Sequence, residues 1–155
     1  MKALTVCNPY PELILRGEKR VENREWPTHF RGWCLLHAGK SREWMDSEDY
    51  RLYPNLQWGA IVGAMEVVGC AHIANIQKGT LDAHPRLSWV RLHEHTHGTW
   101  CWIIDRTRRL RTPLPWKGAM GLWDVPDATL KTWDWEPYPS RQIPPAKEAT
   151  SHGLR

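Results

Sequence analysis

Lys19, Glu22 and Arg24 lie close together between two apolar segments of the chain. A lysine offers a mobile cation to a phosphate or a polar oxygen, and a carboxylate can accept a hydrogen bond from an exocyclic amine on a base edge. If the segment after Gly17 is extended, Arg20, Glu22 and Arg24 share one side of it, because side chains alternate along a strand. The same pattern also fits a purely structural ion-pair network, so both interpretations stay open.

Two aromatic residues flank this charged segment and are candidate stacking platforms for a base. Tyr10 precedes the segment and Trp26 follows it. Stacking of a base on an aromatic ring tolerates any base and is worth about 1–3 kcal/mol. Either ring could instead fill the core of the domain, as large aromatic side chains often do.

A basic cluster follows further along the chain, and it suits contacts with a nucleic-acid backbone because tryptophans flank it. Basic runs are more often solvated surfaces, and that interpretation also stays open. The candidate backbone contacts are Arg106, Arg108, Arg109, Arg111 and Lys117.

Three histidines alternate along the chain at His93, His95 and His97. On a strand their imidazoles would face one way, an arrangement that could bind zinc. The segment is polar, Gly98 follows at once and no cysteine lies near, so a solvated loop is the favoured interpretation. We therefore expect no metal site, and nothing in the sequence indicates a cofactor.

The elements that must position these residues are short strands, expected near residues 3–7, 33–39, 59–73, 99–105 and 119–125. The glycines of the third strand suggest the curvature that a small barrel needs. A basic, proline-containing linker is expected between the last two strands. Short helices are expected after Asn8–Pro9, with Gly17 as the C-terminal cap, after Ser41, and after Asp127. The pattern predicts an α+β fold, mainly β, with two or three short helices.

Length and composition place the chain among globular proteins of one domain. It has 155 residues, of which 41% are hydrophobic and 25% charged, and a net charge of +4 that is compatible with an anionic partner. Residues 1–136 are expected to form the domain, and 137–155, rich in Pro and Ser, a disordered tail. The four cysteines form no C-x-x-C pair and are expected to be reduced thiols. With no signal peptide or membrane span, we expect a cytoplasmic protein without membrane contact; its oligomeric state stays open.

The pattern G-x-K-x-x-E-x-R from Gly17 to Arg24 resembles the signature of the ASCH domain family, a branch of the PUA-like superfamily. The resemblance continues in order through residues 26–28, 31–32, 35–40, 59–63 and 113–123. It implies a PUA-like pseudobarrel of five or six strands with helices over its ends. It also implies a cleft between the first helix and the barrel, lined by the motif. The candidate ligand-binding residues are Tyr10, Lys19, Glu22, Arg24, Trp26, Thr28 and Lys40.

The resemblance implies a nucleic-acid-binding protein that recognises RNA, single-stranded nucleic acid or a modified nucleotide. The alternative is an enzyme, either a hydrolase similar to N4-acetylcytidine amidohydrolases or a ribonuclease. The amidohydrolase branch uses Lys, a Thr three residues later and a strand Glu. Lys19 and Glu66 match two of these positions, but Glu22 stands where the Thr hydroxyl belongs. Lys19, Glu22 and Glu66 are therefore catalytic candidates only for the enzyme alternative. A protein-interaction module is a third, less specific interpretation.

Overall fold

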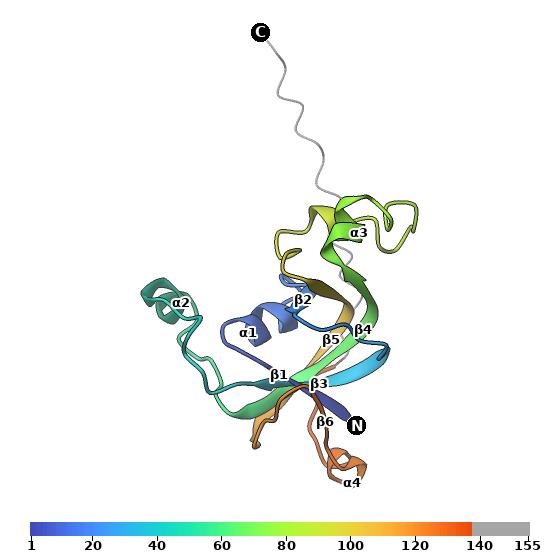
Figure 1. Cartoon of the computed structure of the whole chain (residues 1–155). Coiled ribbons are helices and arrows are strands. Elements are labelled where there is room, and N and C mark those ends of the chain that lie inside the picture. Colours follow the sequence, from blue (N-terminus) through green and yellow to red (C-terminus); the bar gives the residue numbers. More distant parts are fainter. Residues whose placement is uncertain (138–155) are drawn as a thin grey trace.

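The structure is a computed structural model that describes residues 1–137 of the chain. All but the first residue of the predicted tail lie outside the described residues. The described part forms one curled, six-stranded sheet with the strand order β2-β5-β4-β3-β1-β6 (Figure 1). The strands are β1 (Lys2–Val6), β2 (Val21–Arg24), β3 (Gly32–Ala38), β4 (Ala60–His72), β5 (Trp100–Pro115) and β6 (Leu122–Asp124).

Neighbouring strands are antiparallel except for β1 and β3, which run parallel. Four short α-helices and a 3₁₀ turn complete the fold: α1 (Tyr10–Leu15), α2 (Ser47–Leu52), α3 (Ile73–Gln77), the turn Val90–Leu92 and α4 (Asp127–Leu130). The expected α+β, mainly β fold with five or six strands is confirmed, as a curled half-barrel with one helix more than expected.

Two helix starts differ from the sequence prediction. The N-cap of α2 is Asp46 rather than Ser41: its carboxylate accepts hydrogen bonds from the amides of Glu48 and Asp49 at 2.8 and 2.9 Å. The Asp49 carboxylate accepts in return from the Asp46 amide at 3.2 Å, which completes a capping box. Asp127 is the first residue of α4 and not its cap.

The predicted linker after residue 105 is wrong, because β5 continues through it as a strand of 16 residues. Its first part pairs with β2, and pairs with β4 run from His72↔Trp100 to Ala60↔Pro115. The two prolines that suggested a linker stand in the last three residues of β5, the end where a strand tolerates them. The four arginines of the basic cluster are therefore held on β5, in the part of the strand that pairs with β4, and Lys117 follows the strand.

The two faces of the sheet bury different sets of side chains. Helix α1 packs on one face, where Ile14 joins a core cluster with Leu4, Leu36 and Trp102. The opposite face buries Leu35 and covers it with partly buried residues, including Trp33, Trp116, Trp123, Trp133 and Trp135. Cross-strand partners share a face, so Glu22, which pairs with Trp102, lies on the α1 face.

All four cysteines are free thiols, as expected for reduced residues, and Cys34 and Cys101 are buried. Burial raises the pKa of Cys34 to about 12 and that of Cys101 to about 11, so both stay protonated and packed. Across residues 1–137, no helix is long and apolar enough to cross a membrane.

Candidate functional site

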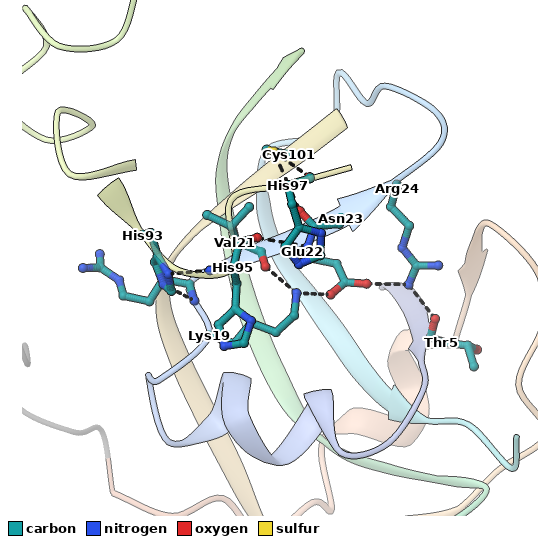
Figure 2. Close-up of polar contacts among 11 residues, drawn as sticks. Thr5, Lys19, Val21, Glu22, Asn23, Arg24, His93, His95, His97 and Cys101 are labelled. Atoms are coloured by element: carbon teal, nitrogen blue, oxygen red, sulfur yellow. Dashed lines mark hydrogen bonds and ion pairs between the residues drawn. The ribbon is translucent and has the colours of Figure 1, made fainter. Parts of the chain in front are cut away.

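The turn after α1 brings Lys19 back between the helix and the sheet (Figure 2). Gly17 adopts a left-handed φ of 76°, which glycine alone reaches without steric cost. The amides of Glu18 and Lys19 then both donate to the Leu13 carbonyl, at 3.0 and 3.1 Å. This is the glycine cap that the sequence predicts, and it turns the Lys19 side chain into the protein, where the residue is only 2% exposed.

Lys19, Glu22 and Arg24 form one continuous polar chain on the α1 face of the sheet (Figure 2). Lys19 Nζ lies 2.8 Å from Glu22 Oε2 and also donates to the Val21 carbonyl. Arg24 Nη2 lies 3.1 Å from Glu22 Oε1 and donates to the Thr5 carbonyl at 2.7 Å. Each carboxylate oxygen of Glu22 thus holds one cation, and the three side chains together carry one net positive charge. We refer to these three residues as the buried charge chain.

Exposure rises along the buried charge chain from Lys19 to Arg24. The side chains of Lys19 and Glu22 are 3% and 7% exposed, whereas that of Arg24 is 22% exposed. Arg24 Nε is buried and has no hydrogen-bond partner among the described residues. A buried donor without an acceptor costs about 1–3 kcal/mol, so Arg24 keeps one polar group that the surrounding residues leave unsatisfied.

Tyr10 and His95 lie beside Lys19. Lys19 Nζ stands 5.3 Å from the centroid of the Tyr10 ring, a cation–π distance. His95 meets the same ring edge-on, with 6.5 Å between centroids and an interplanar angle of 79°. Burial, and after it the charge of Lys19, lowers the pKa of His95. Tyr10 is half-buried, so part of its ring can reach a ligand.

The alternating histidines hold β2 in place. His93 Nε2 accepts the Arg20 amide hydrogen at 2.9 Å, and Asn23 Nδ2 donates to the His95 carbonyl at 3.0 Å (Figure 2). Burial and then the neighbouring His95 lower the pKa of His93 to about 4, which keeps the ring neutral as an acceptor. The described residues hold no group of three His, Cys, Asp or Glu suited to a metal ion.

Arg20 does not join Glu22 and Arg24, although the alternation of side chains predicts that it should. It precedes β2, and its guanidinium lies 4.1 Å from the centroid of the Trp89 ring and 3.4 Å from Asp105 Oδ1. Strand alternation therefore places Arg24 with Glu22 correctly, but it fails at Arg20, before the strand begins.

The other candidate ligand-binding residues have different neighbours. Trp26 packs edge-on against Trp102, with ring centroids 4.7 Å apart, and is therefore part of the core packing. Thr28 is buried in the loop before β3, where its hydroxyl accepts the Phe30 amide hydrogen at 3.0 Å. Lys40 is exposed, and its aliphatic carbons lie against Gly59.

The catalytic candidates do not come together. Glu66 pairs across strands with Trp33, which packs on the face opposite α1. There it accepts two hydrogen bonds from Arg106, at 2.6 and 2.8 Å. Lys19 and Glu22 lie on the α1 face, so the sheet separates them from Glu66.

The basic cluster of β5 is divided between the two faces of the sheet and between separate partners. Arg106 contacts Glu66 and Trp33, and Arg108 lies 5.0 Å from the Trp135 ring centroid. On the α1 side, Arg109 donates to both oxygens of Glu12 at 2.9 and 3.0 Å. Burial favours a higher pKa for Glu12, but hydrogen bonds from Arg109 and Arg16 outweigh it and lower the pKa.

The two remaining members of the cluster are the most exposed. Arg111 Nε lies 3.3 Å from Asp134 Oδ1 and its side chain is 52% exposed. Lys117 follows β5 and is exposed. A single phosphate track along all five cations is therefore absent from the described structure.

Sequence reasoning missed two buried polar residues, Asn8 and His37. His37 Nε2 hydrogen-bonds to the Trp116 carbonyl at 3.0 Å, and its Nδ1 has no partner among the described residues. Asn8 follows β1 and is completely buried. The Asn-Pro dipeptide marks the end of a strand, but no sequence signal shows that its side chain turns inward.

Comparisons with known proteins agree with this architecture. The family model described as "ASCH domain" matches residues 4–102. Human activating signal cointegrator 1 (Homo sapiens) is 27% identical over 135 residues, which span 79% of this chain but only 22% of that protein. The crystal structure of a point mutant of the ZmASCH protein from Zymomonas mobilis superposes with a TM-score of 0.52 at 10% identity. The match covers 86% of this chain and 98% of that one, and it supports the fold alone.

Proposed function

The chain belongs to the ASCH domain family, and from that premise we propose that it binds RNA or a modified nucleotide beside the buried charge chain. The observation that carries the proposal is Arg24 at the open end of the buried charge chain, because its side chain is 22% exposed and its Nε–H has no acceptor among residues 1–137. Arginine presents several donors in a planar fork that matches phosphate and base oxygens. Arg24 is therefore the proposed ligand contact, through a phosphate oxygen or a base carbonyl.

Lys19 and Glu22 act in this proposal as positioning residues. Glu22 fixes the Arg24 guanidinium through Oε1, and Lys19 compensates the charge of the other oxygen. A direct role for Glu22 in reading a base amine has less support, because both of its oxygens already accept from cations and its side chain is 7% exposed. Tyr10 supplies a partly exposed ring for stacking next to this group.

Phosphate contacts from the β5 cluster form the second part of the proposal. Arg111 and Lys117 are the exposed members, and each would contact a separate phosphate. Such exposed contacts weaken as the salt concentration rises. Arg109 is engaged by both oxygens of Glu12 and is assigned a structural role.

The hydrolase alternative has less support than binding. Glu22 replaces the hydroxyl that the amidohydrolase pattern needs, and the sheet separates Lys19 from Glu66. Product analysis of the binding samples tests this alternative directly, because deacylation or strand cleavage would appear as new species.

The test of binding is fluorescence anisotropy of a labelled single-stranded RNA with Arg24→Ala and Arg24→Lys. Removing a charge-assisted hydrogen bond of about 1.5–3 kcal/mol should weaken binding roughly 10- to 100-fold, and lysine should restore only part of it. Arg51→Ala is the matched control, because it removes the same charge from an exposed side chain on α2. If both alanine variants weaken binding equally, the proposed contact is wrong. The same titrations with DNA and with modified nucleotides define the ligand.

A further inference from the structure

The segment between β3 and β4 forms an arm, residues 41–58, which carries α2 away from the sheet (Figure 1). No residue of α2 is buried, and no residue of the arm belongs to the hydrophobic core clusters of the described structure. The helix is held by its own contacts instead, which are the capping box of Asp46 and Asp49 and an ion pair between Arg51 and Glu48 at 3.1 Å. The arm therefore adds little to the core and is presented as a separate element.

The base of the arm is tied to the body of the domain at two points. The Arg16 guanidinium lies 5.3 Å from the centroid of the Tyr53 ring. The Asn8 side-chain amide, which is completely buried, donates to the Gln57 carbonyl at 2.8 Å. These contacts hold the arm in a defined orientation. A surface that is already ordered loses less conformational entropy when a partner binds.

Large apolar side chains are exposed on the arm. Trp44 is 59% exposed, Leu52 53% and Tyr50 40%. The other exposed large hydrophobic residues of the described chain, Leu92 and Met120, lie in two separate segments. Single exposed apolar residues are ordinary, but several on one short segment mark an interaction site.

Two aromatic rings of the arm already contact a cation. The Tyr50 and Trp58 rings are nearly parallel, with centroids 6.5 Å apart and 20° between their planes. The Arg42 guanidinium lies 5.0 Å from the Trp58 centroid and 6.0 Å from the Tyr50 centroid, which are cation–π distances. Arg42 and Tyr50 are exposed, and Trp58 is half-buried. The ring pair thus accepts a guanidinium at the surface, and the same chemistry serves a cationic side chain of a partner.

The arm is acidic on a basic chain. It carries two arginines, Arg42 and Arg51, and its four carboxylates are those of Glu43, Asp46, Glu48 and Asp49. The carboxylates therefore outnumber the cations here, whereas the whole chain has a net charge of +4. Excess negative charge repels a phosphate backbone and attracts a basic partner. The sign of the charge thus separates the arm from the proposed RNA contact.

We infer that the arm is a docking surface for another protein, through a segment rich in lysine and arginine with apolar side chains between them. The cations of that segment face the carboxylates of the arm and the rings of Tyr50 and Trp58. Its apolar side chains cover Trp44 and Leu52. Tryptophan, tyrosine and arginine are the residue types that contribute most to binding in protein interfaces. The surface shares no residue with the proposed contact at Arg24 and adds a second kind of partner to it.

The test is fluorescence anisotropy of the full chain with two labelled amphipathic model peptides of equal length, one of leucine and lysine and the other of leucine and glutamate. The lysine peptide should bind saturably and the glutamate peptide should not, although the chain itself is positively charged. Trp44→Ala should weaken binding by about tenfold or more, as expected for a central interface residue. Leu92→Ala is the matched control, because it truncates an apolar side chain that is even more exposed, at 81%, on a different segment.

The charge of the arm is tested by a double variant, Glu43→Gln with Glu48→Gln. Both side chains are exposed, so the melting temperature should stay the same. Association of the lysine peptide should become slower and less dependent on salt, because charges at the edge of an interface act mainly on the association rate. An unchanged association rate would contradict the role of the carboxylates.

The inference is overturned if the lysine peptide does not bind saturably, if both peptides bind equally, or if Trp44→Ala and Leu92→Ala weaken binding equally. Sedimentation equilibrium of the chain alone tests a second copy as the occupant, and self-association that Trp44→Ala abolishes would overturn the inference in its favour. Loss of RNA binding in Trp44→Ala would assign the arm to the RNA site instead. Arg24→Ala should leave peptide binding intact, so the docking surface stands even if the proposed RNA contact fails.

Discussion

Two groups of charged residues in this domain both form ion pairs, but they differ in how far those pairs are buried. The buried charge chain joins Lys19, Glu22 and Arg24 in a nearly enclosed line on one face of the sheet. The β5 cluster has more cations, but alternation along the strand divides them between two faces, and their acidic partners are separate. The density of charged residues along the sequence therefore does not indicate where electrostatic interactions are strongest. Burial does indicate it, because a low-dielectric environment strengthens ion pairs and hydrogen bonds and raises the cost of a donor without an acceptor.

The largest effect that tests this contrast is expected for Glu22→Gln. This change keeps the shape of the side chain but leaves Lys19 and Arg24 enclosed without a counter-charge, and breaking a buried pair costs about 3–5 kcal/mol. Chemical denaturation should show a loss of that size. Asp134→Asn is the matched change in the β5 group. Because the Arg111–Asp134 pair is exposed on both sides, at 52% and 67%, its loss should stay below about 1 kcal/mol. Equal losses of unfolding free energy in the two variants would show that burial does not separate the two groups.

A pH dependence should follow from His93, whose imidazole accepts the amide hydrogen just before β2. Its folded pKa of about 4 lies below the ordinary value of 6.5, so the unfolded state binds more protons between these values. Stability should therefore fall as the pH falls from about 6.5 towards 4. His95 acts in the same direction, because burial lowers its pKa too. His93→Gln keeps an acceptor without titrating and should flatten the dependence above pH 5.

An intermediate effect is expected for Arg109→Ala, since the Arg109–Glu12 pair is half-buried and bidentate. The loss should be about 1–2 kcal/mol, near the lower end for hydrogen bonds to charged groups. The Glu12 pKa is lowered from its ordinary value of 4.5, so the stability that Glu12 contributes is present above that pH and lost on acidification through the folded pKa. Arg109→Ala should weaken this acid sensitivity. Melting curves between pH 3 and 7 measure both effects, and a fully retained sensitivity would assign it to another carboxylate.

The smallest effect is expected for Arg111→Ala on RNA binding. If Arg111 neutralises one phosphate, the slope of log affinity against log salt should fall by about 0.7, the value for one contact on a single strand. Folding stability should change by less than about 1 kcal/mol, because the side chain is exposed. Titrations at four salt concentrations measure the slope. An unchanged slope would leave Arg111 without a role in binding.

The sequence predicts the order of the elements well, because local patterns encode it. Gly17 predicts the left-handed turn, and the β-branched run with three glycines predicts the curved strand β4. The β5 linker was wrong because prolines and arginines suggest a loop, whereas pairing of these residues with β4 overrides that preference. Tertiary pairing of this kind is not visible in a short window of sequence.

The charged residues of the candidate site stand out in the sequence, but their degree of burial could not be predicted from it. A lysine between two charged residues looks solvated, and only the fold of α1 over the sheet encloses Lys19. The same holds for Asn8, whose inward side chain depends on Gln57, a residue 49 positions away. Contacts across such separations determine which polar groups lose water, and residue types alone do not report them.

The position of β1 has a consequence for how the protein is made. Of the six strands β1 is synthesised first, yet one of its neighbours in the sheet is β6, at Leu122–Asp124. A nascent chain that has reached Trp102, where the family match ends, can pair β1 with β3 but leaves its other edge open. Open strand edges recruit other chains, so the ribosome-bound intermediate should be the form most prone to aggregate. Three residues that lie outside the family match thus cover the exposed edge of β1, the first strand to be synthesised.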